Sequence, residues 1–158
     1  MSSLIALRGR VALLGLVALL FASPAVRADD DKVTVSVVAI LATDQNANVE
    51  KKLSGIATEL QKRNPKLTGF QTAKETCKEI GLNADEKFEL VEGQVVTITV
   101  EQAANKQNKN RLKISPPTLG DITYCTACGK FLPIITEYKT KNGEVLIIAI
   151  RVQPCRDK

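Results

Sequence analysis

Histidine and tryptophan are absent from this chain of 158 residues, and tyrosine and phenylalanine together supply only six aromatic rings. Without an imidazole, the chain cannot build a Ser-His-Asp or Cys-His nucleophile system, an HExxH zinc site or a CxxCH haem attachment. The scarcity of aromatic rings also makes a sugar-stacking cleft hard to form. Most common hydrolase designs are therefore excluded.

The first 28 residues have the parts of a secretory signal peptide. Arg8 and Arg10 give a positive start, residues 11–22 are apolar, and Val26 and Ala28 stand at positions −3 and −1 of a cleavage point. An apolar run of 12 residues is shorter than the roughly 20 that a membrane-spanning helix needs. We expect cleavage of residues 1–28, export to the periplasm or the medium, and no stable membrane insertion afterwards.

The remaining residues, 29–158, suit a single exported domain that can bury a core of its own. Removal of the signal takes away three arginines and no acid, so the formal charge falls from +5 to +2. Binding of nucleic acid or of an anionic membrane needs clustered Lys and Arg. We therefore expect no nucleic acid among the partners and a protein or another envelope component instead.

The N-terminal half of this domain shows one strand pattern and one helix pattern. Residues 33–43 alternate and then become continuously apolar, as in a strand whose second half is buried on both faces. Asn48 can cap a helix that Asn64-Pro65 ends. The apolar face of that helix would hold Val49, Leu53, Ile56, Ala57 and Leu60.

Residues 67–80 fit two descriptions. Phe70, Ala73, Cys77 and Ile80 share one helical face, whereas the threonines of the same stretch favour an extended chain. Both interpretations stay open, and we prefer the strand.

The second half has the pattern of antiparallel strands. Asn142-Gly143 predicts a type I′ hairpin turn, and residues 145–150 have no polar side chain and should form a central strand. The expected strands are residues 88–90, 95–100, 112–114, 122–124, 131–138 and 145–150. The fold class is α+β, a mainly antiparallel sheet with one amphipathic helix packed on one face.

Four cysteines, all in the exported part, are candidates for structural disulfide bonds. They are Cys77, Cys125, Cys128 and Cys155. An even number in an oxidising compartment favours pairing, but four cysteines allow three connectivities and the sequence does not choose among them.

The same cysteines permit a thiol-based alternative. All four could bind zinc if the fold gathers them, because Cys125-x-x-Cys128-Gly resembles one knuckle of a zinc ribbon. A redox centre at Cys125 and Cys128 would need the first thiol at a helix N-terminus. The residues after Cys128 indicate a turn and a strand instead, so we expect no cofactor, with zinc as the alternative.

The sequence contains two further groups of charged residues, one basic and one acidic. The basic cluster Lys106, Lys109, Arg111 and Lys113 lacks a neighbouring aromatic ring and is typical of a solvated hairpin. Pairs of acids could serve a carboxylate enzyme if the fold brings two together with raised pKa values. The candidates are Asp85, Glu86 and Glu89, or Glu137 and Glu144.

Residues 37–42 with 49–60, and residues 129–135 with 143–150, resemble an uncharacterised group of small exported bacterial proteins over most of the mature chain. The resemblance implies an envelope or secreted setting and assigns no functional residue. We therefore expect a non-catalytic exported domain with a binding or structural role in the cell envelope. The alternative is a zinc or redox protein that uses the CxxC at 125–128.

Overall fold

The computed structural model describes residues 32–153. The predicted signal peptide, residues 1–28, and Cys155 lie outside this range. Within it, no helix combines the length and the apolar character that a membrane crossing requires.

The described residues form eight strands and one α-helix, preceded by a turn of 3-10 helix. In chain order these are β1 (Val33–Thr43), η1 (Lys51–Leu53), α1 (Ser54–Arg63), β2 (Gly69–Ile80), β3 (Asp85–Glu89), β4 (Val95–Gln102), β5 (Lys109–Ser115), β6 (Ile122–Ala127), β7 (Phe131–Lys139) and β8 (Val145–Gln153). They make two antiparallel sheets, sheet A in the order β2-β1-β8-β7 and sheet B in the order β3-β4-β5-β6.

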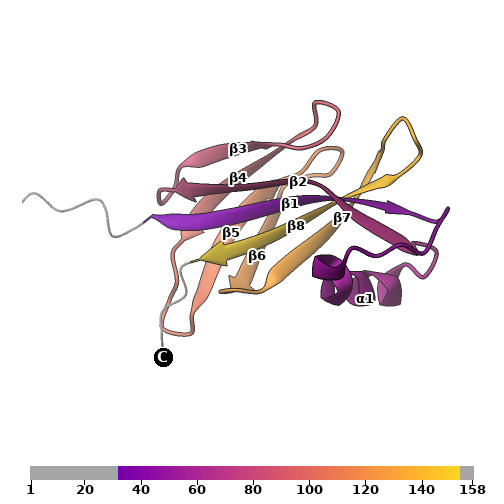
Figure 1. Cartoon of the computed structure of the whole chain (residues 1–158). Helices are drawn as coiled ribbons and strands as arrows, with labels where there is room; N and C mark the ends of the chain where they lie inside the picture. Colours follow the sequence, from indigo (N-terminus) through magenta and orange to yellow (C-terminus); the bar gives the residue numbers. More distant parts are fainter. Residues whose placement is uncertain (1–31, 154–158) are drawn as a thin grey trace, which may run out of the picture.

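The two sheets stack on one another, and α1 packs on the face of sheet A that is turned away from sheet B (Figure 1). The predicted class, α+β with mainly antiparallel strands and one helix on one face, is confirmed. The central strands of sheet B, β4 and β5, alternate buried and less buried positions, which suits a sheet with one face in water.

Strands β1 and β8 lie side by side in the middle of sheet A and are covered on both faces. Alternate residues of each strand enter the core between the sheets, and the others enter a second core under α1. In β8, Leu146, Ile148 and Ile150 face sheet B, whereas Ile147 and Ala149 face the helix side. The continuous apolar runs at 33–43 and 145–150 are therefore strands buried on both faces, as predicted.

The helix begins later than expected. The structure has η1 from Lys51 and α1 from Ser54, and no side chain of the described residues caps either helix. The chain before η1 pairs with β2 instead: the amide of Phe70 donates to the carbonyl of Asn48 at 2.8 Å, and the amide of Glu50 donates to the carbonyl of Phe70 at 3.0 Å. Val49, expected on the buried helix face, forms this bridge and is 37% exposed.

Residues 69–80 form strand β2, so the preferred interpretation of this segment is confirmed. The pairing with β1 skips Ala73, because Ala39 faces Lys74 and Ile40 faces Thr72. A bulge of one residue reverses which face the following side chains occupy. Phe70 therefore packs under α1 while Ile80 packs between the sheets, and the simple period of two is lost from the sequence.

The last hairpin has a different turn from the one predicted. Of its tip residues only Gly143 has a positive φ, 83°, whereas a type I′ turn needs two such residues. The amide of Thr140 donates to the carbonyl of Glu144 at 2.9 Å, which closes a three-residue loop at positions 141–143. Glycine is used where that loop enters the left-handed region.

Replacement of Gly69 by alanine should destabilise the fold. A methyl group there would meet the Asn46 side chain and would lie 2.7 Å from Cγ2 of Thr43. We expect a loss of about 1–3 kcal/mol in the free energy of unfolding, as for overpacking. Gly55 in α1 has open space around it, so Gly55→Ala should stabilise by about 0.5–1 kcal/mol. Urea denaturation of both variants checks this, and equal midpoints would contradict it.

Replacement of Asn110 by valine should stabilise the fold. Asn110 is 1% exposed, and neither polar atom of its amide has a hydrogen-bond partner among the described residues. A buried group of this kind costs about 1–3 kcal/mol, so Asn110→Val should raise the free energy of unfolding by about 1–2 kcal/mol. Leu112→Ala, two positions along the same face, should lower it by about 2–5 kcal/mol. A lower urea midpoint for Asn110→Val would show that the amide is satisfied in solution.

Candidate functional site

Two of the predicted disulfide cysteines carry free, exposed thiols. Cys77 lies on β2, on the helix side of sheet A, where its sulfur is 3.4 Å from the hydroxyl of Ser36. Cys125 lies on β6, on the outer face of sheet B, opposite Arg111. The expectation that all four cysteines are paired is therefore wrong for Cys77 and Cys125. For Cys128 and Cys155 it stays a prediction.

The CxxC segment does not bring its two sulfur atoms together. Cys128 follows β6 and is half-buried, its sulfur 3.4 Å from the carbonyl oxygen of Val152, and it is not a free thiol. Residues three apart on an extended chain point to opposite faces. Gly129, with φ 78°, then leads into β7, as the turn-and-strand interpretation predicted. No helix begins at Cys125 to activate its thiol.

The structure also separates the cysteines that a zinc site would need. Cys77 and Cys125 occupy edge strands of different sheets and face outward from opposite sides of the stack. A tetrahedral site requires every Zn–S distance to be near 2.3 Å. Between residues 32 and 153, no three residues of the types His, Cys, Asp and Glu form a group that could hold a metal.

Three of the four residues of the predicted basic cluster lie along one sheet face, whereas Lys106 lies in the turn before β5. Lys109, Arg111 and Lys113 alternate along β5 on the outer face of sheet B. Lys113 forms an ion pair of 2.9 Å with Asp121, and the hydrogen bond that it donates to this carboxylate raises the pKa of Lys113. Ion pairs of this kind fit the solvated hairpin that the sequence indicates.

The candidate acids are tied to neighbouring strands. Glu86 and Glu89 of β3 form ion pairs with lysines of β2 at 2.6 and 3.5 Å, and Asp85 accepts a hydrogen bond from the Thr99 hydroxyl at 2.5 Å. Glu144 lies in the β7–β8 hairpin, and Glu137 is exposed on β7. These contacts join the β3 acids to lysines and to a hydroxyl group rather than to one another.

A polar groove of about 470 Å³ lies where the segment before η1 runs along β2. We call it the β2 groove. Leu41, Val49 and Phe70 are the larger apolar residues of its lining. The polar side chains that line it belong to Thr43, Asn46, Asn48, Glu50, Gln71, Thr72 and Glu144.

The asparagine-rich segment at 44–50 supplies part of the groove's lining. The Asn46 side-chain oxygen accepts a hydrogen bond of 3.0 Å from the Asn48 amide, and the Asn46 carbonyl accepts one of 2.5 Å from the Thr68 hydroxyl. Together with the backbone bonds to Phe70, these contacts hold the segment against β2. Gly69 allows the approach because it has no Cβ.

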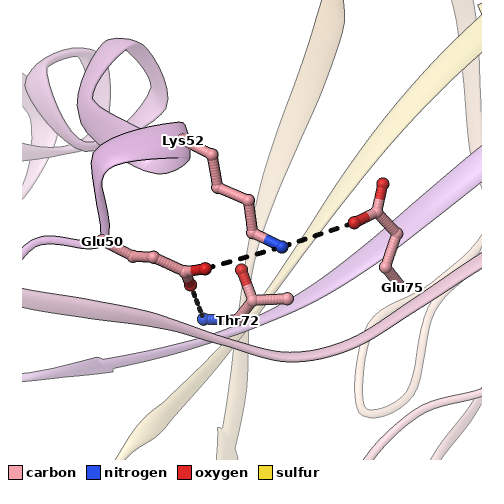
Figure 2. A network of polar contacts seen from close by, with 4 residues as sticks. All are labelled: Glu50, Lys52, Thr72 and Glu75. Atoms are coloured by element: carbon pink, nitrogen blue, oxygen red, sulfur yellow. Dashed lines mark hydrogen bonds and ion pairs between the residues drawn. The ribbon is translucent and has the colours of Figure 1, made fainter.

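Glu50 contacts both Thr72 of β2 and Lys52 of η1 (Figure 2). One carboxylate oxygen accepts a hydrogen bond of 2.8 Å from the Thr72 amide, and the other lies 3.5 Å from Nζ of Lys52. The same Nζ lies 3.4 Å from Glu75 on β2. Thr72, whose amide donates to the carboxylate, and the nearby charge of Lys52 hold the pKa of Glu50 below its ordinary value.

Glu144 supplies the other carboxylate of the groove. Glu144 accepts a hydrogen bond of 3.0 Å from the Gln71 side chain. The groove is therefore lined by two carboxylates and several side-chain amides, and none of its lining residues is basic. Such a lining binds hydrogen-bond donors and cations. The sequence indicated only a polar turn at 44–48, because the alignment of that turn with Gln71 and Glu144 depends on tertiary pairing.

Comparisons of this chain with models of protein families, with curated proteins and with solved structures find no match. No relative therefore assigns a role to any residue of the groove.

Stability should fall in acid partly through Glu50. Its folded-state pKa lies below the ordinary 4.5, so its contribution is complete above that value and is lost as the pH falls through the folded pKa. Glu50→Gln should lower the urea midpoint at pH 7 and weaken its decline below pH 4.5. Glu137→Gln, on exposed β7, should change neither. Identical pH profiles for Glu50→Gln and the parent would contradict the role of this carboxylate.

Proposed function

We propose that this protein is a non-catalytic, exported binding domain of the cell envelope. Its β2 groove binds an extended segment of a partner protein that carries basic side chains. The observation that carries this proposal is that two carboxylates, Glu50 and Glu144, line the same groove, while none of its described lining residues is basic. A cationic segment is complementary to that charge.

A binding role suits these groups better than a catalytic one. A general acid needs a raised pKa, whereas the contacts of Glu50 with Thr72, and after them the charge of Lys52, lower the pKa of Glu50. The chain has no histidine to exchange protons near neutral pH. The free thiol of Cys125 stands on a strand, apart from the sulfur of Cys128. Neither the carboxylate nor the thiol enzyme is favoured.

The envelope setting rests on the sequence. Residues 1–28 have the form of a cleavable signal, and the resemblance to small exported bacterial proteins agrees with that. In an oxidising compartment, a bridge between Cys128 and Cys155 would fix the end of the chain. No cofactor belongs to this proposal, and its partner is a protein or another envelope component rather than nucleic acid.

A short lysine peptide should bind in the β2 groove. In an NMR titration of the labelled protein with tetralysine, the backbone amides of Asn48, Gln71 and Thr72 should shift. Added salt should weaken the effect because exposed ion pairs are screened. Glu144→Gln removes one carboxylate and should raise the dissociation constant about two- to fivefold, the range expected for an exposed pair.

The controls separate the groove from general charge attraction. Glu137→Gln removes the same charge from an exposed position on β7 and should leave the dissociation constant unchanged. A tetraglutamine peptide should cause no shifts. Equal weakening by both glutamate variants, or shifts confined to another surface, would overturn the proposed binding site.

A further inference from the structure

Three of the four edge strands carry features that prevent pairing with another chain. Four of the five residues of β3 are charged. β2 has a bulge at Ala73 and charged side chains from Lys74 to Glu79, and β7 contains Pro133 and an irregularity after Ile135. Charges, proline and bulges at edges are the usual protection against strand addition.

Strand β6 has none of these features. Its six residues, Ile-Thr-Tyr-Cys-Thr-Ala, include no charge and no proline, and its register with β5 is uninterrupted. Most of these residue types favour strands, and Tyr124 is 40% exposed. β6 is therefore the open edge of the described sheets.

The hydrogen-bond ladder shows which groups that edge presents. The amide of Cys128 donates to the carbonyl of Asn108 at 3.1 Å, in register with the β5–β6 pairs. Hydrogen-bonded and non-hydrogen-bonded pairs alternate along an antiparallel ladder. Tyr124, an even number of positions before Cys128, therefore directs its backbone groups toward β5. Thr123 and Cys125 consequently direct their amides and carbonyls away from β5.

We propose that β6 pairs antiparallel with β6 of a second copy of this chain. A twofold axis perpendicular to the sheet keeps the outer faces together, so one residue of the strand must lie opposite its own copy. With Cys125 at that position, Tyr124 lies opposite Thr126 of the other copy, and Thr123 lies opposite Ala127. The two sheets B would then form one sheet of eight strands.

A second copy fits this edge for two reasons. No charged side chain of β6 would face a like charge across the axis. The nearest outward charges, Arg111 of each copy, would be three strand spacings apart, about 14 Å. That distance exceeds the Debye length of about 10 Å at 0.1 M salt, so the repulsion is screened. This inference does not depend on the β2 groove or its ligand.

Analytical ultracentrifugation tests the pairing of β6 with β6. The protein is used as purified from the cells that make it. Under reducing conditions we expect twice the monomer mass. Thr123→Pro removes an amide that faces the open edge and takes no ladder bond from β5, so this variant should sediment as a monomer with an unchanged circular dichroism spectrum. A monomeric parent protein at all concentrations, or a folded Thr123→Pro dimer, would overturn the proposal.

Thiol cross-linking tests the register without a proline in the strand. Opposed residues in a hydrogen-bonded pair have Cα atoms about 5.5 Å apart, within the range for a disulfide. With oxidised glutathione, two Cys125 thiols would lose two protons and two electrons to form the bridge, and the reagent would be reduced to two glutathione molecules. A covalent dimer should form in Cys77→Ser and be absent in Cys125→Ser. Cross-linking through Cys77, or glutathione adducts alone, would contradict the register.

Discussion

The pairing of β1 with β8 is the contact on which the rest of this structure depends. Both strands are apolar on both faces, so each must be covered twice. Sheet B covers one face, and α1 with the chain around it covers the other. Each fully buried Val, Leu or Ile contributes about 1.5–3 kcal/mol, and these two strands hold a large share of such residues. The two cores are therefore joined through one pair of strands.

The position of the β2 groove follows from this double coverage. The helix is short and covers only the part of sheet A around Ile40 and Ile147. The chain that connects β1 to the helix must turn back over Phe70, and it does so by pairing its backbone with β2. That path sets Glu50 against Thr72 and leaves an open polar channel beside it. The groove therefore results from the path that the chain takes over Phe70 between β1 and the helix.

The sequence predicted most strands because burial on one or both faces leaves a clear pattern of apolar residues. The predicted start of the helix was wrong because the carbonyl of Asn48 and the amide of Glu50 form hydrogen bonds with the backbone of Phe70, a residue far away in the chain. The Asn142-Gly143 pair could not distinguish a two-residue from a three-residue loop. The cysteines were a different case. Once residues 122–124 were assigned to a strand, the period of two already implied that Cys125 and Cys128 would point to opposite faces.

Charged side chains are unevenly distributed among the edge strands. The lysines and glutamates of β2 and β3 form ion pairs along the open side of the stack, as between Lys78 and Glu86. Exposed pairs of this kind add little stability, since their typical value is about 0–1 kcal/mol. Their physical effect is to make an edge unattractive to another strand. The charge on β2 and β3 is therefore explained by protection of their edges, and β6, which has no charged residue, lacks this protection.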